Sequence, residues 1–374
     1  MSLSSLPLML AMILLMPAMR AASAPASTSP DLQWVTAYYA GWQYDKLKPE
    51  QIDFRALTHL VHFSVLPQAA GTLDWQQHSL SEERSKEVVQ AAHQADRKVL
   101  LCVGGAFTAP GFRGAMNLKN RARFVESLVS AVQARGYDGL DIDMEPLEEN
   151  DTADYSAFIR ALRTALRDAN KTWILTAAVG DSPKMFAPLQ DEFDQINIMT
   201  YDMSGTWEGW ETWHNAPLHN GGLRFLSNGQ LLPSLETKIQ QWLDGGLSAK
   251  KLGLGLAFYG YIWRGASGPN QPIVGVKAEQ IQYADLMRNY YRADRYHWHE
   301  ATDVPYLSVE GTDKVRAFIS FDNERSLQLK VAYARRIGLG GAIIWELGTG
   351  YRGDQPAGQR DVLLQAVRAA AFNK

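Results

Sequence analysis

The sequence predicts an α/β protein built as a (β/α)8 TIM barrel, with a small α+β insertion between the seventh strand and the seventh helix. Short β-rich runs recur along the 374 residues, and segments with helical periodicity lie between them. One long interval, residues 261–318, interrupts this alternation. The composition, 46% hydrophobic and 21% charged, fits a globular chain with a large core.

Eight β-rich runs, each bounded by turns or helices, are expected to form the parallel strands of the barrel. The predicted strands span residues 34–39, 60–66, 99–103, 139–145, 174–179, 196–201, 252–259 and 341–345. In a barrel of this kind the active site lies at the carboxyl ends of the strands. Residues at the ends of these runs are therefore the first candidates for function.

Helix-period segments alternate with the strands, and one of them opens with Ser81 as a capping residue before two acids. Inside the insertion we expect one helix, residues 278–292, and strand-like fragments around 296–298 and 315–319. The predicted barrel helices span residues 81–95, 121–135, 152–170, 234–243, 324–337 and 361–371.

The stretch 137–145, Tyr-Asp-Gly-Leu-Asp-Ile-Asp-Met-Glu, is the most informative in the chain. In a strand, alternate side chains point to opposite faces, so Asp141, Asp143 and Glu145 line one face and apolar residues the other. Three acids this close in a partly buried place cannot all stay ionised, so at least one pKa must rise. A raised carboxyl pKa suits a general acid. Asp138 lies off this face, and we expect it to be structural.

Two other interpretations of the acidic row are a solvated strand face and a site for a hard cation. An EF-hand loop is excluded because its required glycine would fall at Pro146. Apolar segments on both sides of the strand disfavour a solvated face. Three further strand ends carry acids, phenols or an indole, which together favour a sugar-binding cleft although each alone is more often core packing. These ends are Tyr201-Asp202, Tyr259-Gly260 and Trp345-Glu346.

The first 24 residues are interpreted as a signal peptide and residues 25–33 as a tether, which leaves 34–374 as the catalytic barrel. The apolar run 6–18 is too short to span a bilayer, and small residues follow it. We therefore expect a secreted or periplasmic protein without a membrane anchor. An ordered N-terminal helix is the alternative.

Composition also limits the partners. The net charge of -3 and the pI near 6.3 give no electrostatic reason to bind nucleic acid or an anionic membrane. The single cysteine, Cys102, excludes an intramolecular disulfide. Because no histidine cluster with ligand spacing accompanies the acids, we expect neither a metal nor a cofactor. We expect a monomer.

Several motifs resemble those of glycoside hydrolase family 18, the chitinases and their relatives. Residues 138–145 match the family's D-x-x-D-x-D-x-E signature at all four acidic positions. The resemblance covers about residues 34–351, and the insertion stands where many chitinases carry one that walls the cleft. Other motifs similar to the family's are Tyr38-Tyr39-Ala40-Gly41-Trp42, Met199-Thr200-Tyr201-Asp202, Gly205-Thr206-Trp207, His214-Asn215-Ala216-Pro217-Leu218, Phe258-Tyr259-Gly260 and Gly340-Gly341-Ala342-Ile343-Ile344-Trp345.

The resemblance implies an endo-acting chitinase whose substrate, chitin or a chitooligosaccharide, supplies the nucleophile, an exception to the scheme with two catalytic carboxylates. The substrate's 2-acetamido oxygen would attack the anomeric carbon and give an oxazolinium intermediate with net retention. Glu145 would protonate the leaving oxygen, while Asp143 would share a proton with Asp141 and hydrogen-bond the acetamido N–H. Tyr201 would hold the acetamido carbonyl, and Trp345 would form the floor. Substrate contacts are implied for Tyr38, Phe63, Gly104, Gly105, Met199, Asp202, Trp207, Tyr259 and Trp345.

Four positions depart from the family pattern. Cys102 replaces the usual serine of the third strand, and a thiol forms weaker hydrogen bonds than a hydroxyl. Met144 and Pro146 flank the acid where tryptophan and tyrosine are common, which puts one contact on the leaving-group side in doubt. Tyr261 stands where an arginine often follows Phe-Tyr-Gly.

Several alternatives stay open. The cluster Trp207, Trp210 and Trp213 is either an aromatic platform or loop packing. An endo-β-N-acetylglucosaminidase acting on N-glycans, or a related activity on peptidoglycan, is the alternative with the same fold. A non-catalytic chitooligosaccharide-binding lectin is an alternative of another class, but such relatives typically lack the acid that Glu145 supplies here. A barrel with unrelated chemistry is the last alternative.

Overall fold

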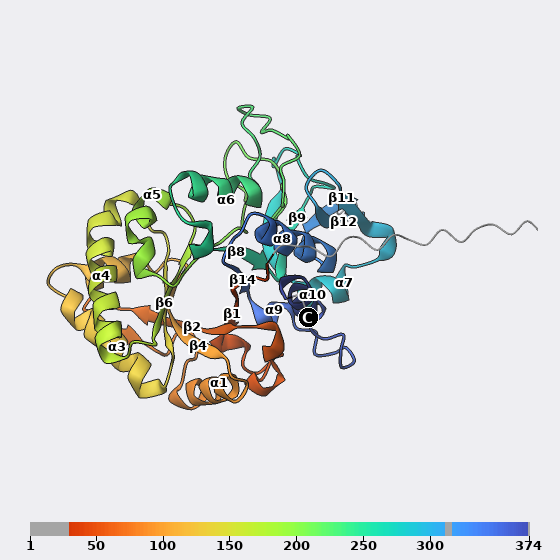
Figure 1. Cartoon of the computed structure of the whole chain (residues 1–374). Helices are drawn as coiled ribbons and strands as arrows, with labels where there is room; N and C mark the ends of the chain where they lie inside the picture. Colours follow the sequence, from red (N-terminus) through yellow and green to blue (C-terminus); the bar gives the residue numbers. More distant parts are fainter. Residues whose placement is uncertain (1–29, 311–315, 373–374) are drawn as a thin grey trace, which may run out of the picture.

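A computed structural model describes residues 30–310 and 316–372, so the predicted signal peptide and most of the tether lie outside the described residues. The barrel strands, in spatial order, are β1 (Trp34–Ala40), β14 (Gly341–Trp345), β8 (Leu252–Ala257), β7 (Gln195–Ile198), β6 (Ile174–Val179), β5 (Gly139–Met144), β4 (Lys98–Gly105) and β2 (His59–Pro67). All neighbours pair in parallel, and β1 pairs with β2 to close the ring. Helices surround this ring (Figure 1), which confirms the predicted barrel.

The eight predicted strands are all present, but three end earlier than expected. β7 stops at Ile198, so Tyr201 and Asp202 follow it in a loop rather than completing it. β8 stops at Ala257, and a separate strand begins at Tyr259. Glu145 lies one residue beyond β5. These functional candidates therefore stand just past the strand ends, at the rim of the barrel.

The six predicted barrel helices are confirmed to within one residue at each end. They are α1 (Glu82–Gln94), α3 (Arg121–Arg135), α4 (Thr152–Ala169), α6 (Leu235–Asp244), α8 (Glu324–Arg336) and α10 (Val362–Ala371). The sequence did not predict the short helices α2 (Ala109–Met116), α5 (Pro183–Phe186) and α9 (Leu347–Gly350). The strand–helix alternation is also incomplete, because the described chain between β1 and β2 forms only 3-10 turns.

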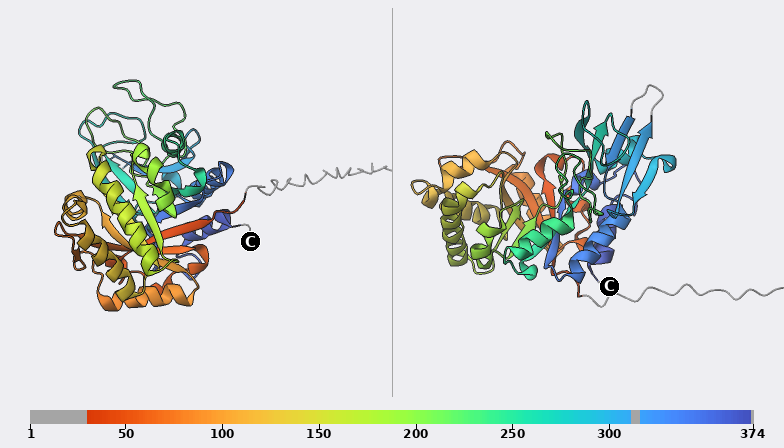
Figure 2. Two further views of the ribbon diagram at one scale, coloured as in Figure 1. Left: turned by 60° about the vertical axis from the view of Figure 1, so that its left-hand side comes forward. Right: turned by 90° about the horizontal axis from the view of Figure 1, so that it is seen from above.

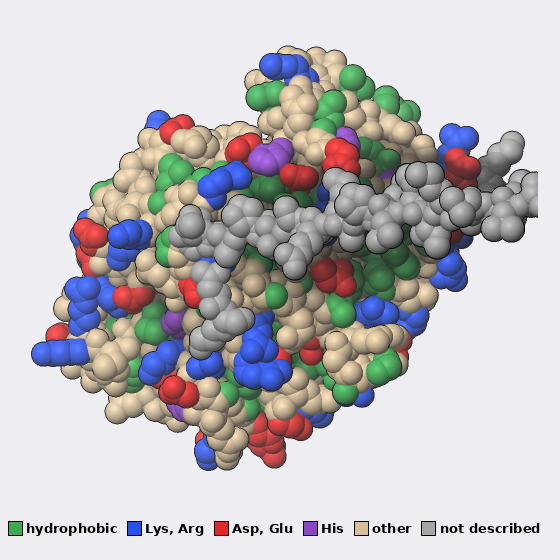
Figure 3. All heavy atoms as spheres, turned by 45° about the vertical axis from the view of Figure 1, so that its right-hand side comes forward, with side chains coloured by type: hydrophobic (Ala, Val, Ile, Leu, Met, Phe, Trp, Pro, Cys, Tyr) green, Lys and Arg blue, Asp and Glu red, His purple; other side chains and the backbone are tan. Residues whose placement is uncertain are grey.

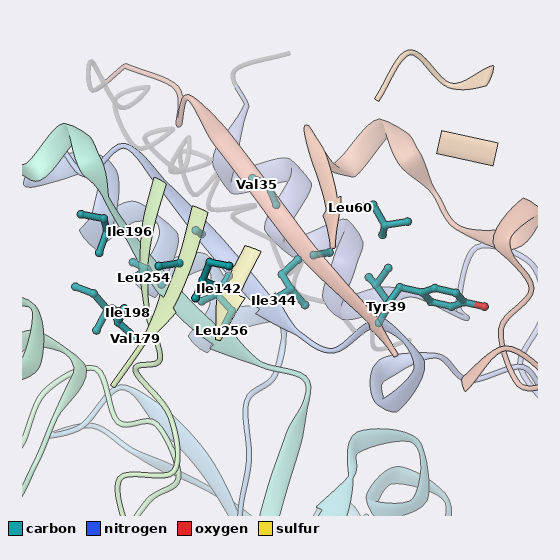
Figure 4. Close-up of a cluster of buried hydrophobic side chains, with 14 of the residues drawn as sticks. Val35, Tyr39, Leu60, Ile142, Val179, Ile196, Ile198, Leu254, Leu256 and Ile344 are labelled. Carbon is teal, nitrogen blue, oxygen red and sulfur yellow. The ribbon is translucent and has the colours of Figure 1, made fainter. Parts of the chain in front are cut away.

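The apolar face of each barrel strand packs outward against the helices. Ile142 of β5, Val179 of β6 and Leu254 of β8 belong to one large buried cluster (Figure 4). Alternate residues point inward, where polar pairs such as Thr36 Oγ1 donating to Gln195 Oε1 (2.8 Å) occupy the barrel. This alternation turns the acids of β5 toward the barrel interior.

The insertion is a five-stranded antiparallel sheet with one short helix, seen beside the barrel in the right panel of Figure 2. Its strands, in spatial order, are β10 (Lys277–Gln282), β9 (Tyr259–Arg264), β13 (Arg316–Ser320), β12 (Val304–Glu310) and β11 (Tyr296–His299), and its helix is α7 (Tyr283–Asn289). Strands occur where fragments around 296–298 and 315–319 were expected, although residue 315 itself is not described. The helix predicted for 278–292 is wrong over its first part, where β10 pairs with β9 instead.

On the face that Figure 3 shows, lysine, arginine and carboxylate side chains are intermixed. Among the described residues, no helix combines the length and the apolar character that crossing a membrane would require. Cys102 is buried and unpaired. Stability of the described chain therefore rests on packing and hydrogen bonds.

Candidate active site

Asp141 is the deepest acid of the row and is firmly held. It is fully buried, and its two carboxylate oxygens accept hydrogen bonds from Tyr38 Oη (2.8 Å) and Thr176 Oγ1 (2.5 Å). Burial raises the pKa of Asp141, while the hydrogen bonds from Thr176, Tyr38 and the Cys102 thiol act in the opposite direction. The thiol therefore still supports the cluster in the place of the family's serine.

Asp143 lies one step closer to the cleft, and its environment differs. It is 3% exposed, and its Oδ1 has no hydrogen-bond partner. Burial, followed by the charges of Glu145 and Asp141, raises the pKa of Asp143 well above its usual range. No hydrogen bond joins the Asp143 side chain to Asp141 in the described structure, so the proton sharing expected from the sequence remains a prediction. A buried carboxyl oxygen without a partner is costly unless a ligand satisfies it.

Glu145 occupies the mouth of the row. Its side chain is half-buried, and no other described residue forms a hydrogen bond with it. Burial and then the charge of Asp202 raise the pKa of Glu145 to about 6. A carboxyl group that keeps its proton close to neutral pH and faces a cleft can act as a general acid.

Tyr201 and Asp202 stand opposite the acidic row, after β7. Tyr201 is buried, and its ring centroid lies 6.0 Å from that of Tyr259. Asp202 has a left-handed backbone, φ 54, which Asn215 Oδ1 stabilises by accepting from its N–H at 2.9 Å. Its Oδ1 accepts from Tyr259 Oη at 2.7 Å. Asp202 is exposed at the cleft, but the groups around its carboxyl still desolvate it enough to raise its pKa.

Aromatic side chains form the floor of the site. The Trp345 ring lies 5.4 Å from Tyr38 and 4.7 Å from Phe63, centroid to centroid. His78 stacks on Phe63 at 5.6 Å, and the exposed Trp42 packs edge-on against both. An apolar ring face beside unsatisfied polar groups suits a sugar, which presents both C–H and hydroxyl surfaces.

These groups enclose a cleft of about 270 Å³. It is lined by Tyr38, Trp42, Phe63, His78, Ala106, Asp143, Glu145, Ala178, Met199, Tyr201, Asp202, Gln280 and Trp345. A second cavity of about 380 Å³ shares Tyr201 and Asp202 with it, and a third of about 200 Å³ shares Glu145 and Met199. The second and third also share Asp181, so the three cavities adjoin one another, and together they are called the groove.

Some predicted substrate contacts do not line the catalytic cleft. Gly104 and Gly105 are buried beneath it; a Cβ on Gly104 would lie 2.0 Å from the carbonyl oxygen of Asp143, so these glycines allow close strand packing. Tyr259 is also buried and holds Asp202 from behind. These three residues can act on a substrate only through their neighbours.

The three tryptophans of the cluster, Trp207, Trp210 and Trp213, lie in different environments. Trp207 is 50% exposed, and together with Trp210 it lines the 380 Å³ cavity, the two rings being 4.5 Å apart. Trp213 is fully buried and donates through Nε1 to the Pro233 carbonyl at 2.8 Å. Trp207 and Trp210 therefore line a cavity, and their role as an aromatic platform stays a prediction, whereas Trp213 packs inside the loop.

Four site residues were not singled out from the sequence: Trp42, His78, Thr176 and Gln280. Thr176 is the register partner of Asp141 on β6, so pairing the inward positions of adjacent strands could have found it. Trp42 lies inside a quoted motif but was not assigned a role. His78 and Gln280 carry no local signal, because their positions depend on loops and on the insertion.

Known proteins resemble this chain over most of its length. The family model described as Glycosyl hydrolases family 18 matches residues 35–350. Chitinase A1 of Niallia circulans is 31% identical over 287 residues, 67% of this chain and 40% of the relative, so the match spans about two fifths of that protein.

No group of three or more histidine, cysteine or acidic residues among those described could hold a metal ion.

Two examples illustrate the likeness to solved structures that share the fold. Ostrinia furnacalis Group IV chitinase gives a TM-score of 0.76 at 24% identity, covering 90% of this chain and 99% of that one. Human YKL-39, described as a pseudo-chitinase with retained chitooligosaccharide binding, gives 0.76 at 21% identity, covering 90% and 99%. At these identities the likeness establishes the fold alone.

Proposed function

The chain belongs to glycosyl hydrolases family 18, and from this premise we propose that it is an endo-acting chitinase that cleaves β-1,4-linked N-acetylglucosamine polymers with retention. The observation that carries the proposal is the state of the acidic row. Asp143 has a buried oxygen without a partner, and Glu145 has a pKa raised to about 6 at the cleft. A ligand can therefore form a hydrogen bond with Asp143, and Glu145 can donate a proton.

In the proposed reaction, the acetamido carbonyl oxygen of the sugar at the scissile bond forms a bond to the anomeric carbon. The bond from that carbon to the leaving oxygen breaks, and this oxygen takes the proton of Glu145. Asp143 accepts a hydrogen bond from the acetamido N–H as positive charge spreads over the oxazolinium ring. Water then attacks the same carbon from the face that the leaving group vacated, the bond from this carbon to the acetamido oxygen breaks, and the Glu145 carboxylate takes a proton from the water. Because the carbon is inverted twice, its configuration is retained.

The neighbours of these two acids have supporting roles. Tyr201 donates a hydrogen bond to the acetamido oxygen, and Trp345 lies under the sugar. Asp141, fixed by Tyr38 and Thr176, keeps a negative field near Asp143 that disfavours a second free carboxylate. The reaction therefore needs no residue to form a covalent bond with the sugar.

The extent of the groove supports action within a polymer. One cavity extends from Glu145 to Trp42 and His78, and the adjoining one is lined by Trp207 and Trp210. These cavities leave room for sugars beyond those at the scissile bond. This favours endo-acting cleavage.

A non-catalytic sugar-binding protein is the second candidate, because the fold is shared with a protein described as a pseudo-chitinase that binds chitooligosaccharides. The intact Glu145 argues against it. An endo-β-N-acetylglucosaminidase acting on N-glycans, or an enzyme acting on peptidoglycan, would use the same reaction on another substrate.

One digestion experiment separates these candidates. We expect the purified protein to cut a defined N-acetylglucosamine hexamer at internal bonds, and Glu145→Gln, which keeps the shape of the side chain, to bind the hexamer without cutting it. Binding by both proteins with no cleavage by either would identify a lectin. Release of glycan from an N-glycoprotein, or of fragments from peptidoglycan, in preference to hexamer cleavage would identify the alternative enzymes.

We also propose that the apolar run 6–18 directs export and that the chain is cut near Ala24. These residues lie outside the described structure, so the proposal rests on sequence alone. Mass spectrometry of the exported protein should show an N-terminus close to residue 25. An intact Met1 on the exported protein would contradict it.

A further inference from the structure

Gln280 brings the insertion sheet into the catalytic cleft. It lies on β10, opposite Tyr261 of β9, and lines the cleft. Its Nε2 donates to Tyr261 Oη at 3.1 Å and, over a longer 3.5 Å, to Asp202 Oδ1. A residue some eighty positions along the chain from Asp202 therefore contacts the side chain that raises the pKa of Glu145.

The groups around Asp202 are neutral on this side. Tyr259 donates to the same carboxylate oxygen at 2.7 Å. A cation that acts on Asp202 is Lys238 of α6, which lowers the pKa of Asp202, lines the neighbouring cavity and pairs with Asp181 at 3.3 Å. No lysine or arginine lines the catalytic cleft in the part of the chain that the structure describes.

We propose that Gln280 is a positioning residue for Asp202, and that the uncharged Gln280–Tyr261 pair holds Asp202 beside Glu145 without neutralising its charge. The insertion then belongs to the catalytic machinery and is more than a wall of the cleft. This inference rests on the proposed function, because it assigns Glu145 the role of a general acid.

The electrostatic consequence has a definite sign. An ionised Asp202 repels the ionised form of Glu145 and so raises its pKa. A cation at position 280 would pair with Asp202, weaken this repulsion and lower the pKa of Glu145. An extra anion there would raise it. The other titratable groups that line the same cavities as Glu145 or Asp202, or interact with them, are unchanged in the variants below. They are Tyr38, His78, Cys102, Asp143, Asp181, Tyr201, Lys238, Tyr259 and Tyr261.

The test is the basic limb of the pH profile of kcat/KM at low ionic strength, which reports the protonated fraction of Glu145. We expect Gln280→Lys to shift the midpoint of this limb to lower pH and Gln280→Glu to shift it to higher pH. Each shift should be only about half a pH unit, because the site is open to solvent, which screens the added charge. Glu279→Gln is the matched control. Its side chain lies one position away on β10, pairs with Arg264 and leaves the cleft untouched, so the limb should not move.

Action through Asp202 is tested by the double variant. Asp202→Asn alone should shift the midpoint of the basic limb to lower pH, and adding Gln280→Lys to this variant should give little further shift. Shifts in the same direction for both charge variants, or an undiminished shift without Asp202, would overturn the proposal.

A readout without turnover separates this inference from the proposed function. In carboxyl-labelled free protein, the ¹³C titration of Glu145, assigned by its loss in Glu145→Gln, should show the same opposite shifts. If the wild type hydrolyses nothing but these titrations shift as expected, the proposed function fails and the positioning role stands. If hydrolysis is normal and neither the profile nor the titration shifts, the positioning role fails.

Discussion

Two aspartates at opposite ends of β5, Asp138 immediately before it and Asp143 near its carboxyl end, differ in their hydrogen bonds and in the direction of their pKa shifts. At the start of the strand, Asp138 pairs with Lys98 at 2.9 Å and His93 at 2.8 Å and accepts from the Val99 N–H at 2.9 Å. Burial alone would raise the pKa of Asp138, but these hydrogen bonds outweigh it and the pKa is lowered. At the other end, Asp143 has an oxygen without a partner, and its pKa is raised.

The difference comes from the partners that each end of the barrel supplies. Donors from β4 and α1 satisfy Asp138 and tie three elements together. At the carboxyl end of β5, the aspartate faces a cleft with two other acids nearby and no cation lining it among the described residues. The amino end of the strand thus serves stability, and the carboxyl end is left unsatisfied for chemistry.

The largest expected effect lies at the unsatisfied end. Glu145→Gln removes the transferable proton but keeps the shape of the side chain, so we expect kcat to fall by at least roughly 100-fold. Hexamer binding, measured by calorimetry, should stay within a few-fold of wild type. Substantial residual cleavage would assign the acid role to another group.

Asp143→Asn should be nearly as severe, for another reason. The amide cannot accept the acetamido N–H as a carboxylate does, nor exchange a proton within the row. Because Asp143 and Glu145 act as one unit, the double variant should be little worse than the worse single variant. Fully additive losses would show that the two acids act independently.

Tyr201→Phe comes next in size. Its hydroxyl is proposed to act mainly as the acetamido group attacks, so kcat should fall about tenfold or more while KM changes little. Steady-state kinetics on a soluble oligomer decides this. An unchanged kcat would make Tyr201 a packing residue only.

A substitution at the amino end of β5 should instead affect the stability of the fold. We expect Asp138→Asn to lower the free energy of unfolding by about 1–3 kcal/mol, the range for hydrogen bonds to charged groups, and to leave kcat unchanged. Urea unfolding at pH 7 measures the loss. Reduced kcat in the folded variant would break the division between the two ends.

The pH dependence of stability sharpens the contrast with a smaller effect. The folded pKa of Asp138 is lowered, so its contribution is present above its unfolded pKa and is lost as pH falls through the folded value. The folded pKa of Glu145 is raised to about 6, so its contribution is lost as pH rises through 6. As the pH rises from 5 to 7.5, the free energy of unfolding of Glu145→Gln should therefore increase by about 1–2 kcal/mol relative to that of the wild type. Unfolding curves for both variants across pH test these opposite signs.

The barrel could be predicted because its signals are local. Period-two strands and period-three-to-four helices determine the eight strands and six main helices. The sequence did not predict α2, because Pro110, Gly111 and Gly114 lie inside it and disrupt the helical pattern. The Ala-Glu-Gln-Ile-Gln run at 278–282 has good helix formers, but pairing with β9 overrides that preference.

The candidate site shows the same limit. The acids of β5, Tyr201 and Trp345 follow from strand alternation and from motifs. Gln280 does not, because its place in the cleft depends on how a distant sheet packs on the barrel. Nor could the sequence distinguish Trp207, which lines the groove, from the buried Trp213, since both lie in the same irregular loop.

The central claim is that the substrate's acetamido group, placed between Asp143 and Tyr201, is the nucleophile. NMR of the first products released from an N-acetylglucosamine hexamer tests it most directly. We predict that the new reducing ends appear first as the β-anomer and that fully deacetylated oligomers resist cleavage. An initial α-anomer, or normal cleavage of the deacetylated oligomer, would contradict the account.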